Sequence, residues 1–192
     1  VTCAQLMTSL LAPADALGKT FCIMEYNEKQ SKNDEALLLK KNAEMGNANL
    51  DLRRIYVLTG SVTASASEAV INCLIPYLTR SNIMVIGEKT IGKRVGSNTF
   101  GTREEYDWLL HPITLRIYNA NHEADYANGF EPDVKIEELV IGNDLLPFGD
   151  TNEMLLSEAL SQISGLKSLS ARVESKGRIL LTPSSLERKQ TK

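Results

Sequence analysis

The chain has 192 residues and a mass of 21.2 kDa, enough for one domain with a substantial apolar core. Apolar residues make up 43% of it and charged residues 23%, a globular composition that excludes collagen-like and wholly disordered proteins. No apolar run approaches the roughly 20 residues of a membrane-spanning helix. The formal net charge of -3 gives no electrostatic reason to expect nucleic acid as a partner.

Cysteine and histidine usage predicts neither a disulfide framework nor a metal site. The odd number of cysteines, three, cannot close into pairs, so Cys3, Cys22 and Cys73 are interpreted as buried free thiols. The two histidines, His111 and His122, have no partner at metal-ligand spacing. We therefore expect no metal and no cofactor.

The first third of the chain is predicted to form a helix, a strand and a polar surface segment. Apolar residues recur at helical spacing over residues 2–12, which predicts a helix with one buried face. Residues 21–26 (FCIMEY) are a candidate strand. Residues 27–49 are polar and hold a short helical candidate at 34–44, so we expect a surface segment there.

A strand, a helix and a strand follow in that order. Residues 55–58 and 82–87 are short apolar runs, and residues 66–78 between them are apolar all round, as in a buried helix. Strands that are apolar on both faces and joined by a helix form a parallel crossover. The sequence therefore predicts an α/β fold.

The remaining segments are less regular. They are a glycine-punctuated loop at 92–101, strand-like stretches at 106–110, 113–118 and 134–136, and a closing amphipathic helix at 152–163. Beyond residue 165 the chain becomes basic, with seven Lys/Arg against two Asp/Glu. We interpret residues 1–165 as the core and 166–192 as a solvated extension with a short strand at 178–181; binding of an acidic partner stays open.

Ser65 stands where the first strand turns into the buried helix. At such a turn the next backbone N–H groups lack partners and can stabilise developing negative charge, so a serine there can act as an acyl-transfer nucleophile. The alternative is that Ser65 only caps the helix, with Glu68 completing a capping box. Spacing alone favours the capping interpretation.

A serine nucleophile needs a base, and Lys93 is the candidate. A lysine can serve when its surroundings disfavour the charged form. Lys93 and Ser65 both follow the carboxyl ends of adjacent predicted strands, so we expect them within reach of each other. A rival interpretation is a phosphate-binding loop, since residues 87–93 read GxxxxGK; Arg94 replaces the required hydroxyl, and we expect no nucleotide.

Four motifs together resemble the C-terminal processing (tail-specific) serine proteases, relatives of the tricorn core. They are YVLTGSVTASASE, VIGEKTIGKRVGS, DWLLHPITLRIYN and NGFEPDVKI, and the resemblance runs over residues 1–165. It implies a crotonase/Clp-protease-like α/β core of strand-strand-helix units with a partly parallel sheet.

The resemblance also implies site residues and a reaction. By resemblance, Ser65 is the nucleophile, Lys93 its general base and the Ala66 N–H one oxyanion donor. Ser97 stands where many members carry a glutamine that orients the lysine. The reaction implied is hydrolysis of protein substrates near apolar C-termini through an acyl-enzyme.

Family members usually carry an upstream PDZ domain and a glycine-rich loop that supplies the second oxyanion donor. Neither is in this sequence, so we interpret it as the C-terminal part of a larger protease. The family suggests an exported bacterial protein of the periplasm or cell envelope, and a homo-oligomer is left open.

Two other functions remain as alternatives. The first is a catalytically inactive peptide-binding or assembly module on the same scaffold, because fold does not determine function. A solvated Lys93 pointing away from Ser65 would favour it. The second is an acyl-CoA enzyme of the crotonase type, which ranks lower because it gives no reason for the pair of Ser65 and Lys93.

Overall fold

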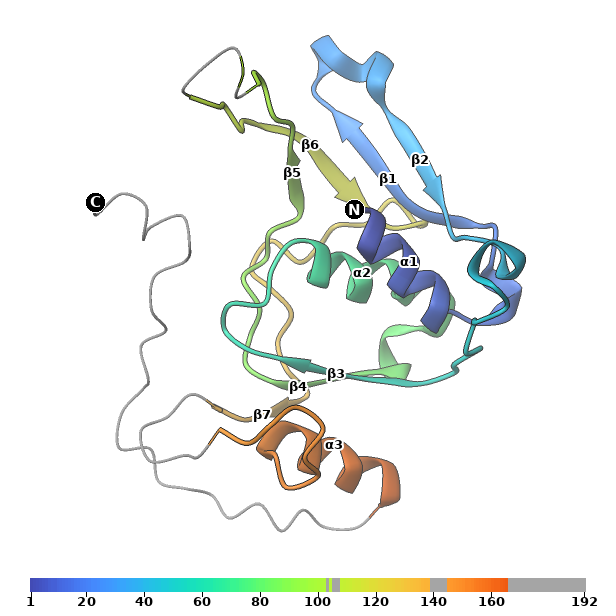
Figure 1. Ribbon diagram of the computed structural model, residues 1–192, viewed down its shortest axis with the longest axis vertical. Helices are drawn as coiled ribbons and strands as arrows, with labels where there is room; N and C mark the ends of the chain where they lie inside the picture. The colour runs from blue at the N-terminus through green and yellow to red at the C-terminus, as the bar shows by residue number, and fades with distance from the viewer. Residues whose placement is uncertain (103, 105–107, 139–144, 166–192) are drawn as a thin grey trace. The chain divides into compact units, whose positions relative to one another are not determined.

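The computed structural model describes residues 1–102, 104, 108–138 and 145–165. The chain divides into two compact units, Val1–Lys135 and Ile136–Lys192. The first unit holds every described strand and the two helices nearest the N-terminus (Figure 1). The candidate site residues all belong to this unit.

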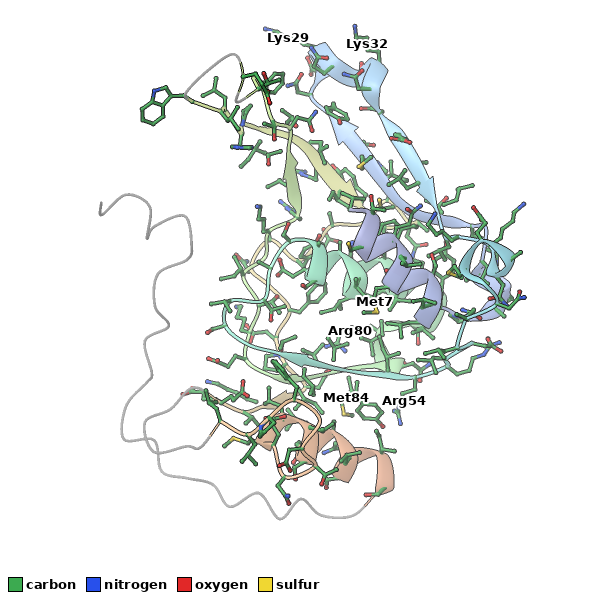
Figure 2. All side chains as sticks on the ribbon, in the orientation of Figure 1. Met7, Lys29, Lys32, Arg54, Arg80 and Met84 are labelled. Atoms are coloured by element: carbon green, nitrogen blue, oxygen red, sulfur yellow. The ribbon has the colours of Figure 1, made fainter. Side chains whose placement is uncertain are left out.

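An antiparallel sheet of four strands forms one layer of the first unit. Its strand order is β2-β1-β6-β5, with β1 at Thr20–Tyr26, β2 at Glu35–Leu38, β5 at Val95–Ser97 and β6 at Ile113–Tyr118. A register shift between Gly96 and Ser97 marks an irregularity in the pairing of β5 with β6. Figure 2 shows Lys29 and Lys32 at the tip of the β1–β2 hairpin.

A parallel sheet of three strands forms the second layer, in the order β3-β4-β7. The strands are β3 (Ile55–Thr59), β4 (Ile83–Gly87) and β7 (Val134–Lys135). Helix α2 (Ala66–Leu78) connects β3 to β4, which pair in parallel register along their whole length. The predicted crossover unit and the α/β fold are confirmed.

Helices α1 (Thr2–Leu11) and α2 lie between the two sheets (Figure 1). They share one core with the strands, because residues of both helices and of β1, β3, β4 and β6 form a single buried cluster. Phe21, Ile71, Leu74 and Ile83 in that cluster are at most 1% exposed. Burying each such side chain contributes roughly 1.5–3 kcal/mol, so the core holds the turns that leave β3 and β4 in place.

Four short 3-10 helices connect these elements in the described chain: η1 (Ala14–Ala16), η2 (Glu28–Asn33), η3 (Asn42–Met45) and η4 (Arg80–Asn82). In the second unit, α3 (Met154–Ser164) is capped at its N-terminus by Glu153, whose carboxylate accepts the N–H groups of Leu155 and Leu156. The helix predicted near the end of the core is thus present. None of the helices in the described part of the chain is long and apolar enough to cross a membrane.

Two sequence-based expectations need correction, and several others stay open. The helix predicted over 34–44 is wrong: residues Glu35–Leu38 form β2, because pairing with β1 outweighs a weak local helical pattern. The loop predicted over 92–101 contains β5, a strand too short to show a pattern. The predicted strand 106–110 falls partly outside the described residues, and of it Leu110 makes one bridge, to Phe100. The boundary at 165 stays a prediction, and the basic extension and its strand lie outside the described residues.

The cysteine prediction is right for two residues and wrong for one. Cys22 and Cys73 are buried free thiols, whereas Cys3 is exposed. Burial raises the pKa of the Cys22 thiol to about 12 and raises that of Cys73 as well. Both thiols therefore stay protonated in the folded chain at pH values where an unfolded thiol ionises.

The raised pKa values of the two buried thiols predict that the fold loses stability at alkaline pH. A thiol whose folded pKa lies above its unfolded value near 8.5 stabilises the fold below about pH 8.5, and that contribution declines as pH rises. We expect the free energy of unfolding, measured with urea, to fall between about pH 9 and 12. A Cys22→Ala/Cys73→Ala variant should show a shallower fall, and an equally steep one would contradict the assignment.

Candidate active site

Ser65 occupies a strained turn between β3 and α2. Its φ is 59° and its ψ is -117°, a conformation that residues with a Cβ rarely adopt. Two contacts hold it there: the Ser65 N–H donates to Oε2 of Glu68 at 2.8 Å, and the Ala69 N–H donates to the Ser65 carbonyl at 2.9 Å. A serine on a sharp strand-to-helix turn of this kind projects its hydroxyl away from the backbone.

Lys93 lies in the loop that leaves the neighbouring strand, β4. Backbone hydrogen bonds join this loop to the serine turn at two points. The Glu88 N–H donates to the Thr59 carbonyl at 2.8 Å, and the Ile91 N–H donates to the Thr63 carbonyl at 2.9 Å. The two loops are therefore fixed to each other, as adjacent parallel strands predict.

The Glu68 carboxylate ties the serine turn to the lysine loop. It is fully buried and accepts hydrogen bonds at both oxygens. Oε2 accepts from the backbone N–H groups of Ser65 and Lys93, each at 2.8 Å. Oε1 accepts from the Thr90 hydroxyl and the Gly92 N–H, each at 2.6 Å. One side chain thus sets the position of both backbones that carry the candidate pair.

Thr90 connects this network to the Asn128-Gly129-Phe130 turn. Its hydroxyl, while donating to Glu68, accepts the Phe130 N–H at 2.8 Å. The Thr90 N–H donates to the Phe130 carbonyl at 3.2 Å. Gly129 is needed for this approach, because its φ is +81° and a Cβ would lie 1.9 Å from the Thr90 carbonyl oxygen.

Gly92 is constrained in the same way, and this predicts a large loss of stability on substitution. Its φ is +91° and a Cβ would lie 2.3 Å from the Ala127 carbonyl oxygen. Gly46 is a matched control, since its φ is +62° but nothing lies within 4 Å of a Cβ there. Both alanine variants carry the roughly 1–2 kcal/mol cost of a left-handed residue, and only Gly92→Ala adds a backbone clash. Urea unfolding should show Gly92→Ala at least about 2 kcal/mol less stable than Gly46→Ala; equal values would contradict the geometry.

A pocket of about 210 Å³ lies beside the serine turn. Ser65, Ala66, Lys93 and Ser97 all line it, so the structure brings the four predicted site residues to one cavity. The rest of its lining is mainly apolar, from Val1, Ala4, Phe21, Cys22, Ala69, Val95, Gly96 and Ile117. The cavity can therefore hold an apolar group against the serine and the lysine.

The four residues differ in their surroundings. Ser65 is half-buried, whereas Ala66, Lys93 and Ser97 are exposed. The Ala66 N–H is at the first position of α2, where no intrahelical acceptor exists. The described residues include no group of three or more His, Cys, Asp or Glu side chains that could hold a metal ion.

The part played by Glu68 was underestimated by sequence reasoning. The sequence indicated a capping acid, and the bond from the Ser65 N–H confirms that half of the motif. It did not reveal the three bonds to the lysine loop. A signal was present in the short polar stretch between Glu88 and Lys93, but pairing it with Glu68 requires the tertiary structure.

Comparison with known proteins assigns the family. A sequence model of peptidase family S41 matches residues 6–136, which include the serine turn and the lysine loop. The chain belongs to peptidase family S41. A crystal structure from Bacteroides fragilis of a protein assigned to the S41 proteases shares 37% sequence identity with this S41 chain, at a TM-score of 0.75. The aligned region covers 85% of this chain and 41% of the length of the Bacteroides fragilis protein.

Two more distant structures share the fold of this S41 chain. A lipoprotein from Streptococcus agalactiae has 17% identity and a TM-score of 0.51, covering 83% of this chain and 47% of its own. The photosystem II D1 C-terminal processing protease has 16% identity and a TM-score of 0.51. The aligned region covers 88% of this chain and 37% of the length of that protease. The S41 chain thus spans less than half the length of each. No curated protein sequence matches it at a significant level.

Proposed function

We propose that this chain carries the nucleophile and the base of a serine endopeptidase that cuts protein substrates through an acyl-enzyme. The observation that carries the proposal is the shared pocket, in which Ser65 on a strained turn faces the same cavity as Lys93. Membership of a peptidase family supports it.

In the proposed mechanism, neutral Lys93 takes the hydroxyl proton of Ser65 as the oxygen attacks the substrate carbonyl. The Ala66 N–H stabilises the negative charge that develops on the carbonyl oxygen. Lys93 then returns the proton to the leaving amine, and water hydrolyses the acyl-enzyme. Ser97 lines the pocket beside Lys93 and can accept a hydrogen bond from its amine.

Water exclusion is part of the proposal. Lys93 is exposed in this structure. A peptide seated in the pocket would cover Lys93 and exclude water from it, and loss of water disfavours the charged form of an amine. Val1 lines the same pocket, so α1 begins at the candidate site. The family resemblance puts the second oxyanion donor in a loop before α1, which fits this position.

The substrates that we propose are unfolded protein chains with apolar residues near the C-terminus. The apolar lining of the pocket, from Ala4, Phe21 and Ile117, supports an apolar side chain next to the cut. The family resemblance further suggests an exported protein of the bacterial periplasm or cell envelope, which cell fractionation would test.

The exposure of Lys93 favours a second candidate, a module that binds peptides without cutting them. One experiment separates the two. The complete protein of the open reading frame is incubated with an unfolded reporter that has an apolar C-terminus, and the products are identified by mass spectrometry. Ser65→Ala is compared with Ser67→Ala, which changes an exposed serine two residues further on, in the first turn of α2.

We expect the wild-type protein and Ser67→Ala to cut the reporter, and Ser65→Ala to leave it intact. Cutting that survives Ser65→Ala would overturn the assignment of the nucleophile. Binding of the reporter with no cutting by the wild-type protein would establish the peptide-binding module instead.

A further inference from the structure

A groove of about 310 Å³ lies on the antiparallel sheet, separate from the pocket beside the serine turn. Strands β1, β6 and β5, which are neighbours in that sheet, supply most of its lining (Figure 1). Ser65 and Lys93 are not among the described residues that line it. Of the residues that line the two cavities in the described chain, Val95 alone is shared.

Arg116 supplies the positive charge of this groove. Its neighbours on β6, Leu115 and Ile117, are buried in the core, and side chains alternate along a strand, so Arg116 points to the outer face of the sheet. Ile117 lines the pocket beside the serine turn. The guanidinium and the candidate active site therefore lie on opposite faces of β6.

No described carboxylate forms an ion pair with Arg116, although one stands nearby. Glu25 is directly opposite Arg116 in the pairing of β1 with β6, a position at which opposite charges normally pair. The Glu25 carboxylate instead contacts Nε2 of His122. The guanidinium thus keeps its capacity to bind a carboxylate from outside the described chain.

A series of ring contacts holds the guanidinium in place. It lies 5.9 Å from the centroid of the Tyr118 ring, and its Nη1 donates to the Tyr118 hydroxyl at 3.4 Å. The Tyr118 ring stacks on His122, with 4.2 Å between the centroids, and His122 is held by Glu25. A side chain that is already held in one conformation loses less entropy when it binds a ligand.

The same groove contains a hydroxyl without a partner. Thr114 lines the groove two residues before Arg116, on the same face of β6, and its Oγ1 is buried with no hydrogen bond among the described residues. A buried hydroxyl in this state is unfavourable, and a ligand or water that reaches it removes the penalty. Val95 and Ile113 add apolar surface to the lining, and Ile113 is 68% exposed.

We propose that this groove is a second binding site, which takes a carboxylate that carries an apolar group. The planar guanidinium of Arg116 donates two parallel hydrogen bonds to the carboxylate oxygens, and the apolar group packs against Val95 and Ile113. The C-terminus and the acidic side chains of a polypeptide both present this chemistry. The inference goes beyond the proposed function, because the groove binds its ligand without using Ser65.

Side-chain NMR tests the contact at Arg116 directly. The complete protein carrying Ser65→Ala is titrated with N-acetyl-leucine, and the Nε–Hε signal of Arg116 is identified by its absence from an Arg116→Gln variant. We expect a saturable shift of this signal. N-acetyl-leucinamide, which has the same apolar group and no charge, should leave the signal in place. An equal shift with the amide would overturn recognition of a carboxylate.

A third probe distinguishes the two sources of the carboxylate. N-acetyl-leucyl-glutamic acid α-amide has an acidic side chain and no terminal carboxylate. A shift with N-acetyl-leucine alone assigns the groove to chain ends, a shift with the third probe alone assigns it to acidic side chains, and shifts with both assign it to either source. No shift of the Arg116 signal with either carboxylate would overturn the proposal.

Variants of Arg116 test the site by affinity, with the backbone amide signal of Tyr118 as the measure of binding. Arg116 is exposed, so Arg116→Gln should fold and should weaken binding of the carboxylate probe at least about tenfold. Arg116→Lys should weaken it less, because lysine keeps the charge but loses the paired donors. Arg53→Gln is the matched control, since Arg53 is exposed in the same unit and its guanidinium already pairs with two aspartates. Equal affinities of Arg116→Gln and Arg53→Gln would overturn the site and leave the proposed role of Ser65 unaffected.

Discussion

Replacing Lys93 with alanine is expected to lower kcat/KM for peptide cleavage by between about 10² and 10⁴ without reducing thermal stability. The side chain is exposed, and the backbone N–H of residue 93 still donates to Glu68 in the variant. The loss therefore falls on the proton transfer and not on the fold. Steady-state kinetics on the complete protein and a thermal melt of the same samples measure the two effects.

The Lys93→Arg variant tests whether Lys93 acts as a base or only supplies a positive charge. A guanidinium stays protonated, so it preserves charge in the pocket and cannot accept the proton of Ser65. We expect Lys93→Arg to be as inactive as Lys93→Ala. Lys89→Ala is the matched control, because Lys89 lies in the same loop and forms an ion pair with Glu131. Activity in Lys93→Arg, or its loss in Lys89→Ala, would argue against Lys93 as the base.

Replacing Glu68 with alanine is expected to lower the free energy of unfolding by about 3–5 kcal/mol. Four donors point at this carboxylate, and the residue is fully buried. Removing the acceptor leaves those donors unpaired and disconnects the serine turn from the lysine loop. Urea unfolding measures the loss, and a change below about 1 kcal/mol would contradict the network.

Glu68→Gln tests whether Glu68 positions the site as well as stabilising it. An amide has one acceptor oxygen, so it can serve one pair of donors while its NH₂ group opposes the other pair. We expect kcat to fall at least about tenfold, with a smaller change in KM, at temperatures where the variant is folded. Glu44→Gln is the control, because Glu44 makes the same bond to the N–H three residues before it, at Lys41, but in an exposed turn. If Glu68→Gln lowers stability but leaves kcat unchanged, Glu68 stabilises the fold and does not position the site.

Much of the first unit could be predicted from local pattern. Helix α2 begins and ends where its apolar residues do, and the strands on either side of it are continuous apolar runs. Buried segments of this kind carry strong signals because both faces must be apolar. Strands β2 and β5 were not predicted. They lie at the two edges of one sheet, and their local sequence signal is weak because pairing with β1 and β6 determines their structure.

The residue types of the candidate site, and the edge of the sheet on which they meet, followed from the amino-acid sequence by itself. Ser65 stands at a strand-to-helix turn, and Lys93 follows the adjacent parallel strand, so topology alone brought them to one side. Only the tertiary structure decided how they are held there. The bonds of Glu68 to the lysine loop join residues 22 to 25 positions apart, and the groove at Arg116 depends on which strands pair. Such contacts arise from packing between segments distant in the chain, and no local pattern of residues encodes them.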